Sequence, residues 1–564
     1  MLVPLAGLRV GGRRPAQPRF LLVGPYDPHG GEYTFLAPPL GVWRLAGVLA
    51  ANGIEADVFD PNCCDTTPET AFARRLNETT WDVIGFSTTG MTLQYDLALA
   101  HLAKSCSPGS YLIAGGMEAT FNPELVLRLA PFDVTVLGEG EEPLLEMGRR
   151  IRTGQDLAGI VGTAWRQSDG QVHKHSQPAL GRDALRDAIV ATPYDRMPYG
   201  RYWERLQTRY RVGDLPIKAE REARLAEIRS VRLITLNYCP MGCTFCSSTN
   251  FLTDAQGGKT ARLARLNEHE TLGMLKRIVA AHPGVRTIIF QDDIFVFTQD
   301  PRVLPLCAEI TAAKARGELP ADLQFISTNR IDAMTPERLA AMRQAGFRVL
   351  GFGIESFAPE MLREFNKSQI YPFIRPMLEE ALRLGITPFL DMILTSPRCR
   401  LEDLAENIRQ AYFWMMAGCE VGMYPYIIPF SGAAMARDES LRPHTVFSQR
   451  HIAGTDVVWD QPSKILPIDP RVREAILSIE EAFEANLTRV GDGISHLPSR
   501  IRSLIWVLSA IPVLLREGFA MPDPSAVATS LADRMGTMTA RTPKRPRVPL
   551  QRSAALPPVS AVSE

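Results

Sequence analysis

The chain reads Asn237-Tyr238-Cys239-Pro240-Met241-Gly242-Cys243-Thr244-Phe245-Cys246 near its middle, which sets three cysteines in the spacing Cys-x3-Cys-x2-Cys. Thiolates are soft ligands that suit iron–sulfur clusters. A four-iron cluster needs four ligands, so three cysteines leave one iron open to a substrate. A structural zinc site would normally recruit four protein ligands, but the closest histidine is His269. The spacing therefore favours a [4Fe–4S] cluster on Cys239, Cys243 and Cys246 over zinc or an incidental grouping.

This stretch follows the first strand of a series in which strands and helices alternate. We expect strands at 231–236, 287–290, 324–327, 349–352, 388–394 and 422–427, and helices at 268–281, 303–316, 335–345, 359–365, 374–384 and 401–417. Such alternation predicts a parallel sheet, and six steps are too few for a closed eight-stranded barrel. We therefore expect a partial (β/α)6 barrel of the TIM type, with the cysteines on a loop at its mouth.

A second alternating series precedes the barrel, with strands expected at 20–23, 56–59, 82–87, 111–114 and 134–137. This pattern predicts an α/β domain with a doubly wound parallel sheet of the Rossmann or flavodoxin type. Such sheets bind ligands at the carboxyl ends of their strands, where glycine lets a backbone approach closely. The candidates at these ends are Ser87, Thr88, Gly115, Gly116, Met117, Glu118, Gly138 and Glu139. The alternative is that these glycines serve only the packing of the turns.

Pattern and composition divide the chain into segments. We expect an N-terminal extension (1–18), the front domain (19–151), a connector (152–228), the barrel (229–432), a mainly helical C-terminal domain (433–540) and a disordered tail (541–564). The connector contains a polar stretch at 167–180 in which we expect a hairpin. The tail is rich in proline, serine and arginine, a composition that does not bury enough apolar surface to fold.

Composition narrows the classes of function. The 564 residues predict two or three folded domains, and the formal net charge of zero gives no electrostatic reason to expect a nucleic-acid partner. The most apolar stretch, 504–515, is too short to span a membrane, so we expect a buried or docking helix, with membrane-surface contact as the alternative. Nine cysteines without paired spacing, and a start that lacks the order of a secretory signal, predict a cytoplasmic protein.

The cysteine spacing, with the aromatic Phe245 before the last cysteine, resembles the signature of the radical S-adenosylmethionine (SAM) superfamily. In that family the open iron binds SAM, reductive cleavage of SAM yields a 5′-deoxyadenosyl radical, and the fold is a partial (β/α)6 barrel. Further segments after the second, fourth and sixth strands resemble family segments that meet SAM. The resemblance assigns SAM binding to Phe245, Asp292, Asp293, Glu355, Ser356 and Pro429. The alternative for each acid is a strand-end cap or a salt bridge.

Two other stretches of the barrel bear on this resemblance. The turn Pro429-Phe430-Ser431-Gly432 is similar to the family's Pro-Gly-Thr turn but departs from it at two places. Asn366-Lys367 fits the family run after a helix, without a role that the sequence defines.

The front domain resembles the cobalamin-binding domain attached to one large branch of radical SAM proteins, over residues 19 to about 147. The family usually reads Gly-Gly-Pro-His-Ala-Thr at 115–120, where this chain has Met117 and Glu118 in place of proline and histidine. The resemblance assigns cobalamin contacts to Ser87, Thr88, Gly115, Gly116, Met117, Glu118, Gly138 and Glu139. His29 is not assigned to cobalt, because its surroundings do not complete the motif Asp-x-His-x-x-Gly. The alternative is a flavodoxin-like domain that packs but binds nothing.

Together the two resemblances imply an enzyme that uses SAM, a [4Fe–4S] cluster and cobalamin. The implied reaction is methyl transfer via methylcobalamin to an unactivated carbon, or to a phosphinate, of a small-molecule substrate, with flavodoxin or ferredoxin as electron donor. A non-methylating relative, such as an oxidative cyclase or a ring-rearranging enzyme, shares the same motifs. A corrinoid or iron–sulfur sensor without turnover is the alternative outside enzymes. No nucleic acid and no stable membrane insertion are expected.

Overall fold

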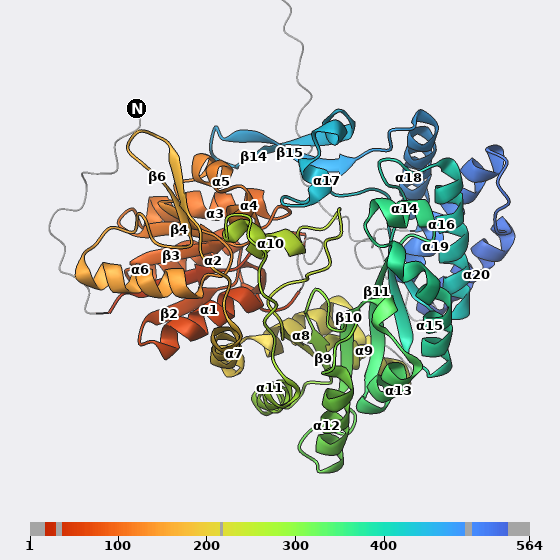
Figure 1. The fold of residues 1–564 in the computed structure, drawn as a ribbon, viewed down its shortest axis with the longest axis horizontal. Coiled ribbons are helices and arrows are strands. Elements are labelled where there is room, and N and C mark those ends of the chain that lie inside the picture. Colours follow the sequence, from red (N-terminus) through yellow and green to blue (C-terminus); the bar gives the residue numbers. More distant parts are fainter. Residues whose placement is uncertain (1–16, 30–35, 215–217, 491–498, 540–564) are drawn as a thin grey trace, which may run out of the picture.

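The computed structural model describes residues 17–29, 36–214, 218–490 and 499–539. The front domain, the barrel and the C-terminal region pack against one another in the arrangement that Figure 1 shows. The expected tail at 541–564 and the first 16 residues of the expected N-terminal extension lie outside the described residues.

The front domain is built on a seven-stranded sheet with the order β2-β1-β3-β4-β5-β6-β7. Its first five strands pair in parallel, which confirms the predicted doubly wound sheet. They are β1 (Arg19–Val23), β2 (Glu55–Phe59), β3 (Val83–Ser87), β4 (Tyr111–Gly115) and β5 (Val134–Val136). β6 (Thr163–Arg166) and β7 (Val172–His175) add an antiparallel hairpin. The sheet therefore continues past 151 into the expected connector, and the hairpin lies at 163–175 rather than 167–180.

Helices bury both faces of this sheet. In β1, Phe20 and Leu22 belong to one hydrophobic cluster, whereas Leu21 and Val23 belong to another. Successive side chains of a strand point to opposite faces, so each cluster fills one side of the sheet. The covering helices are α1 (Leu40–Ala51), α2 (Pro68–Glu78), α3 (Leu93–Cys106), α4 (Met117–Phe121), α5 (Pro123–Leu129) and α6 (Glu141–Thr153).

The barrel is a six-stranded parallel sheet with the order β13-β12-β11-β10-β9-β8. Its strands are β8 (Ser230–Leu233), β9 (Thr287–Phe290), β10 (Gln324–Asn329), β11 (Phe347–Glu355), β12 (Thr387–Ile393) and β13 (Glu420–Tyr424). The outer helices are α11 (Glu268–Ala281), α12 (Val303–Ala315), α13 (Pro336–Ala345), α14 (Pro359–Glu364), α15 (Tyr371–Arg383) and α16 (Leu401–Ala417). β8 and β13 are the two edges of this sheet, which confirms the expected partial barrel.

The segment between the domains forms helices on the flank of the barrel. They are α7 (Arg182–Ala191), α8 (Tyr199–Arg209) and α9 (Lys218–Ile228). Gly47 of α1 lies so close to the backbone of Ala191 that a Cβ would collide with it. Leu185 and Ile189 of α7 and Tyr199 of α8 belong to the same hydrophobic cluster as the barrel. The connector therefore fastens the front domain to the barrel.

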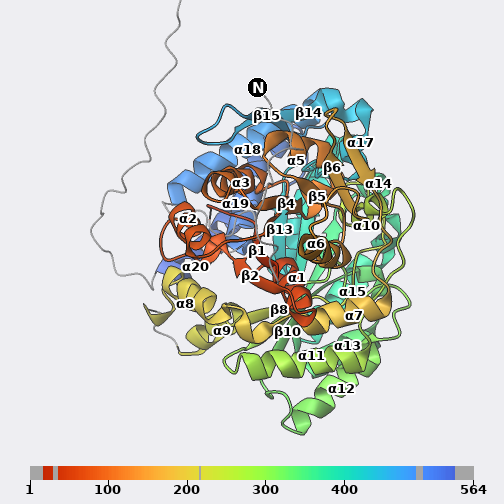
Figure 2. The same ribbon diagram turned by 90° about the vertical axis from the view of Figure 1, so that its left-hand side faces the viewer.

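The C-terminal region is mainly helical, as expected, and it also contains a pair of strands that the sequence did not predict. It contains α17 (Ala434–Arg437), α18 (Pro470–Val490), α19 (Ser499–Arg516) and α20 (Pro524–Thr539), but also an antiparallel hairpin of β14 (Thr445–His451) and β15 (Val458–Ile465). Figures 1 and 2 place this hairpin along the front domain beside α3 and α5. Its Ile452 and Trp459 belong to a hydrophobic cluster of the front domain.

α19 closes the open edge of the barrel. Leu504, Ile505 and Val507 are fully buried, and the Ser503 hydroxyl donates a hydrogen bond to the Val421 carbonyl of β13 at 2.5 Å. This result confirms the expectation of a buried helix at 504–515. Among the described residues, no helix combines the length and apolar character needed to cross a membrane.

Candidate functional site

The loop that carries the three cysteines runs from the end of β8 to α10 (Ser248–Ala255) and is anchored at several points. Thr244 donates hydrogen bonds to the carbonyls of Phe365 and Glu364, at 3.3 and 2.8 Å. The rings of Phe245 and Phe365 meet edge to face at 5.1 Å. Gly242 turns the loop with a φ of 68°, a conformation that favours glycine. The loop geometry is therefore set by contacts with the end of α14 rather than by the cysteines themselves.

Cys239, Cys243 and Cys246 lie together at the mouth of the barrel, half-buried. Burial raises the pKa of all three thiols, to about 12 for Cys239, and their mutual repulsion as thiolates adds to this. Three desolvated thiols at one place suit metal binding, because iron compensates the thiolate charge. The donor set therefore fits the predicted [4Fe–4S] cluster.

No group of three His, Cys, Asp or Glu side chains converges tightly enough to hold a single metal ion within the described ranges.

Asp292 and Asp293 follow β9 and occupy opposite environments. Asp292 is buried and accepts hydrogen bonds from the Thr235 amide and hydroxyl, both at 2.6 Å, and from the Leu236 amide at 3.1 Å. Asp293 is exposed, yet burial raises its pKa while a hydrogen bond from the Ser248 hydroxyl lowers it. Asp293 is thus the more accessible of the two carboxylates. SAM binding stays a prediction for both residues, and Asp293 is the better candidate of the two.

Glu355 and Ser356 are both buried, and each is bonded to another residue of the protein. Glu355 ends β11 with a φ of 61° and pairs with Lys367 Nζ at 2.9 Å. Gly353 makes room for this pair, since a Cβ there would lie 2.5 Å from Glu355 Oε1. Ser356 is fully buried and hydrogen-bonded to Asn407 Oδ1 at 2.9 Å. Lys367 thus gains the role that the sequence left undefined, which is to position Glu355.

The turn that contains Pro429 meets the front domain. Ser431 Oγ lies 3.2 Å from Glu118 Oε1 and accepts a hydrogen bond from Asn122 Nδ2 at 2.9 Å. A Cβ on Gly432 would collide with the Phe121 ring. Pro429 itself is buried. Two of the residues at which the chain departs from the resembled motifs, Glu118 and Ser431, are therefore in direct contact.

α10, which follows the last cysteine, is held between the same two partners. Its Asn250 Nδ2 donates to the Gly432 carbonyl at 2.7 Å, and its Asp254 pairs with Arg437. On the other side, a Cβ on Gly138 of the front domain would lie 2.6 Å from Ala255 Cβ. The strand ends of the front domain and the cysteine loop of the barrel therefore meet at one junction.

Several of the residues predicted to contact cobalamin are committed to protein contacts. Thr88 is fully buried, and its hydroxyl donates to the Gly115 carbonyl at 2.9 Å. Glu118 is buried, and burial raises its pKa. Glu139 Oε2 accepts a hydrogen bond from the Leu180 amide at 2.6 Å, and its pKa is raised to about 7, first by burial and then by Glu141.

Four other predicted cobalamin contacts present backbone or a half-exposed side chain. Ser87, Gly115, Gly116 and Met117 are half-buried at the ends of β3 and β4. A Cβ on Gly116 would lie 2.7 Å from the Thr88 carbonyl, so the backbone here can adopt this close packing only without a side chain. These positions offer a cofactor a surface of backbone and small groups. Cobalamin binding at each stays a prediction.

The β14–β15 hairpin covers this end of the front sheet. Gln94 Nε2 donates to the His451 carbonyl at 2.8 Å, and Gln461 donates to the Gly90 carbonyl. A small enclosed hollow lies at the seam, lined by Met91, Gln94, Tyr95, Ile428, Arg450, Gln461, Pro462 and Ser463. The hairpin was not expected from the sequence and brings new residues to the predicted cobalamin side.

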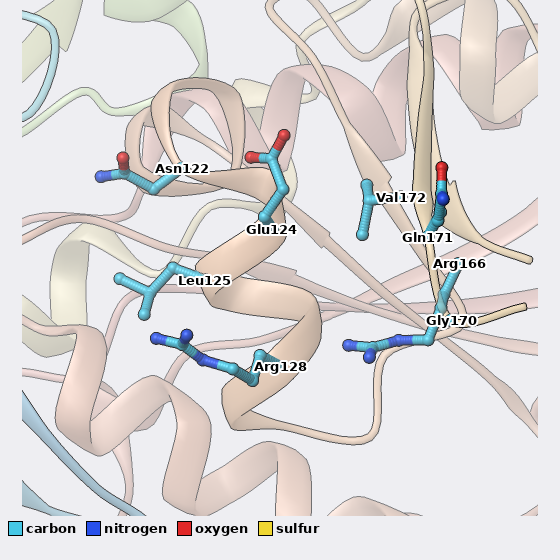
Figure 3. A pocket seen from close by; sticks show the side chains of 8 residues that line it. All are labelled: Asn122, Glu124, Leu125, Arg128, Arg166, Gly170, Gln171 and Val172. Carbon is cyan, nitrogen blue, oxygen red and sulfur yellow. The ribbon is translucent and has the colours of Figure 1, made fainter.

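An open hollow on the outer face of the front domain is distinct from this site. Figure 3 shows Glu124, Leu125 and Arg128 of α5 opposite residues of the β6–β7 hairpin. None of the predicted site residues lines it. It therefore adds nothing to the candidate site.

Two accessible residues of the barrel mouth were missed by the sequence analysis. Asp391 on β12 is half-buried, and Tyr424 at the end of β13 is 50% exposed. Their only signal in the sequence was a polar residue near the end of an otherwise apolar strand.

Comparison with protein families matches two parts of the chain. Residues 28–147 match the B12 binding domain, and residues 233–411 match the radical SAM superfamily. The first range lies within the front domain, and the second covers β9 to β12, most of α16 and the cysteine loop.

Curated relatives carry more than one activity. An uncharacterized methyltransferase of Pyrococcus horikoshii is 24% identical over 377 residues, 66% of this chain and 73% of the relative. The anaerobic magnesium-protoporphyrin IX monomethyl ester cyclase of Rubrivivax gelatinosus is 23% identical over 431 residues, 73% of this chain and 69% of the relative.

Solved structures of the radical SAM methyltransferase TsrM from Kitasatospora setae share the fold. One, with tryptophan substrate and a SAM analogue bound, has a TM-score of 0.62 at 13% identity and covers 93% of this chain and all of that one. Another, with cobalamin and a [4Fe–4S] cluster bound, has a TM-score of 0.59 at 15% identity and covers 88% of this chain and all of that one.

Proposed function

Because this chain is a radical SAM enzyme with a B12-binding domain, we propose that it transfers a methyl group from cobalamin to an unactivated carbon or a phosphinate of a small molecule. When bound, the cluster supplies the electron that cleaves SAM, and cobalamin supplies the methyl group. The relatives named as methyltransferases support this choice over other reactions.

The observation that carries the proposal is the junction between the two domains. The cysteine loop continues into α10, and α10 packs against Gly138 at a strand end of the front domain. Glu118, beside the other predicted cobalamin contacts, is joined to Ser431 of the barrel. Methyl transfer needs the cobalamin face and the SAM site to open into one space, and the contacts at this junction support such an arrangement.

The chain's own residues take the following roles in this proposal. Cys239, Cys243 and Cys246 bind three irons of the cluster and leave the fourth for SAM. Asp293 and Glu355 contact the amino and hydroxyl groups of SAM, with Lys367 positioning Glu355. Ser87, Gly115, Gly116 and Met117 line the cobalamin side. Asp292, Ser356, Thr88 and Glu139 shape the strand ends through hydrogen bonds to protein.

A non-methylating reaction is the second candidate, favoured by the similarity to the cyclase of Rubrivivax gelatinosus. It would use the same cysteines and the same SAM contacts. The two candidates differ in what becomes of SAM: methyl transfer consumes SAM also as a methyl donor and releases S-adenosylhomocysteine.

The test is to purify the protein without oxygen, reconstitute it with iron, sulfide and cobalamin, and add SAM with dithionite or reduced flavodoxin. We expect both 5′-deoxyadenosine and S-adenosylhomocysteine, and loss of deoxyadenosine to background in Cys243→Ala. Cys106→Ala, a half-buried cysteine of α3, is the matched control and should keep both products. Deoxyadenosine alone would favour the non-methylating candidate. If protein with an intact cluster forms neither of the two products, the enzyme assignment is contradicted.

A further inference from the structure

The strands of the barrel expose alternate residues to its interior. On β11 and β12, Leu350, Phe352, Leu390 and Met392 are fully buried under the outer helices. Because successive side chains of a strand point to opposite faces, the residues between them face the interior of the barrel. The strand register pairs these inward residues across the sheet.

Asp391 is an inward residue with glycine on both sides. The register aligns it with Gly353 of β11 and with Gly422 of β13. The position of a Cβ on Gly422 lies 3.4 Å from Asp391 Oδ1. Barrel interiors are normally filled by layers of bulky side chains. This layer instead leaves space on the β13 side of the carboxylate.

The Asp391 carboxylate has no partner inside the protein to balance its charge. Within the described residues it accepts no hydrogen bond and forms no ion pair, and its electrostatic neighbours are Glu355, which repels it, and the more weakly acting Lys367. Burial raises its pKa to about 7. A desolvated carboxylate without a partner costs stability, so its presence in this layer points to a ligand group that completes it.

Aromatic groups border the same space. The Phe389 ring, one layer deeper on β12, lies 3.4 Å from the Cβ position of Gly422. Tyr424, one layer higher on β13, is 50% exposed, although burial raises the pKa of its phenol. Phe389 and Tyr424 therefore lie one layer below and one layer above Asp391 and Gly422 on the inner face of the sheet. The phenol is also within electrostatic reach of Asp391 and of Arg502 on α19.

We propose that Asp391 is the specificity-determining residue for the substrate, which it binds through a positively charged amine carried on an apolar or aromatic body. The inference rests on the proposed function only in treating the inner face of the barrel beside Asp391 as the substrate site. The carboxylate pairs with the ammonium group, and Phe389 and Tyr424 pack against the body. Charge-assisted hydrogen bonds and cation–aromatic contacts favour a cation in such a site.

The test measures binding without turnover. Full-length protein is reconstituted with cluster and cobalamin and saturated with SAM, without reductant, at pH 8. Isothermal titration then compares two amines with the alcohols of the same shape, tryptamine with tryptophol and phenethylamine with phenethyl alcohol. We expect at least one amine to bind about 10-fold more tightly than its alcohol, as a charged hydrogen bond provides. Because no reaction occurs, the result is independent of whether the enzyme transfers methyl groups.

Variants assign the preference to the carboxylate. Asp391→Asn should reduce the amine preference below about 2-fold, whereas Asp391→Glu should retain a preference because it keeps the charge. Asp187→Asn, an exposed aspartate of α7, is the matched control and should behave as the unaltered protein. Circular dichroism verifies that each variant is folded.

Three outcomes would overturn the proposal. Equal binding of amine and alcohol, or no binding of either pair, would show that the site does not select a cation. A preference that survives in Asp391→Asn would place the selecting group elsewhere. A weaker affinity for SAM itself in Asp391→Asn, with the amine preference intact, would assign the carboxylate to the cofactor instead of the substrate.

Discussion

The two parallel sheets of this protein use the polar residues at their strand ends in different ways. In the front domain, Thr88, Glu118 and Glu139 are buried and hydrogen-bonded to protein, and the accessible positions are mainly glycine backbone. In the barrel, Asp293, Asp391 and the three cysteines remain accessible. The front sheet thus offers shape for a large cofactor, whereas the barrel offers groups that react or carry charge.

Two residues of the barrel are exceptions to this difference between the domains. Asp292 and Ser356 follow strand ends, as reactive residues would, but both are buried and bonded to protein. The distinction therefore depends on whether a side chain has protein partners, and not on the domain in which it lies. Replacing a bonded residue should cost stability, whereas replacing an accessible one should not.

The largest expected difference is between two adjacent aspartates. Asp292→Ala removes the acceptor of three hydrogen bonds and leaves the amides of Thr235 and Leu236 buried without a partner. We expect a loss of about 3 kcal/mol in the free energy of unfolding. Asp293→Ala should change it by less than about 0.5 kcal/mol. Urea denaturation followed by tryptophan fluorescence measures both, and equal losses would refute the distinction.

A somewhat smaller effect should appear in the pH dependence of stability. The pKa of Glu139 is raised to about 7 in the folded protein from an ordinary value near 4.5. The folded state therefore holds this proton more tightly, so its stabilising contribution is present below about pH 4.5 and is lost as the pH rises through 7. Between pH 5 and pH 8, the loss of this contribution should lower the free energy of unfolding by on the order of 2 kcal/mol, and we expect Glu139→Gln to remove that decrease. A thermal-melting series in which variant and unaltered protein decline in parallel would argue against it.

The contact between the domains should contribute less to the free energy of unfolding. Glu118→Ala removes the hydrogen bonds to Asn122 and Ser431, but it also relieves the cost of burying a carboxylate whose pKa burial has raised. We expect a net loss of about 1 kcal/mol. A double-mutant cycle with Ser431→Ala isolates the contact between them. Glu124→Ala, an exposed glutamate of the adjacent α5, is the control, and a cycle without coupling would show that the two departures are unrelated.

The smallest effect, with the opposite sign, is expected at Asp391. At pH 8 its carboxylate is ionised above a raised pKa of about 7, so the charge costs stability in the folded state. Asp391→Asn removes this cost but leaves a polar amide without a partner in the same place, so it should leave the free energy of unfolding unchanged or increase it by about 0.5 kcal/mol. A loss of more than about 1 kcal/mol in urea denaturation would mean that the residue has protein partners after all.

The sequence predicted the strands well because their apolar runs are bounded by turn residues. The strand β9 occurs where expected, at Thr287–Phe290, and the other strands differ by a few residues. The loop that carries the three cysteines was also predictable, since all three lie within one short stretch. These features depend on local pattern alone.

Features that depend on distant contacts were not predictable. The β14–β15 hairpin has mostly polar or half-exposed residues and thus lacks the alternation that marks a strand. The environment of Asp391 depends on its register with Gly353 and Gly422, which belong to other strands. Asp292 and Asp293 are indistinguishable in sequence, because a single position along the chain decides which carboxylate is buried.

The hairpin also bears on the order in which the protein becomes stable during synthesis. Ile452 and Trp459 complete a hydrophobic cluster whose other members are mainly residues 21–132 of the front domain. The front domain leaves the ribosome about 300 residues before these side chains do, which is a delay of about 15–60 s at ordinary rates of translation. During that interval the apolar surface that Trp459 later covers is exposed. Until the hairpin has been synthesised, the nascent front domain therefore depends on protection of this surface from aggregation.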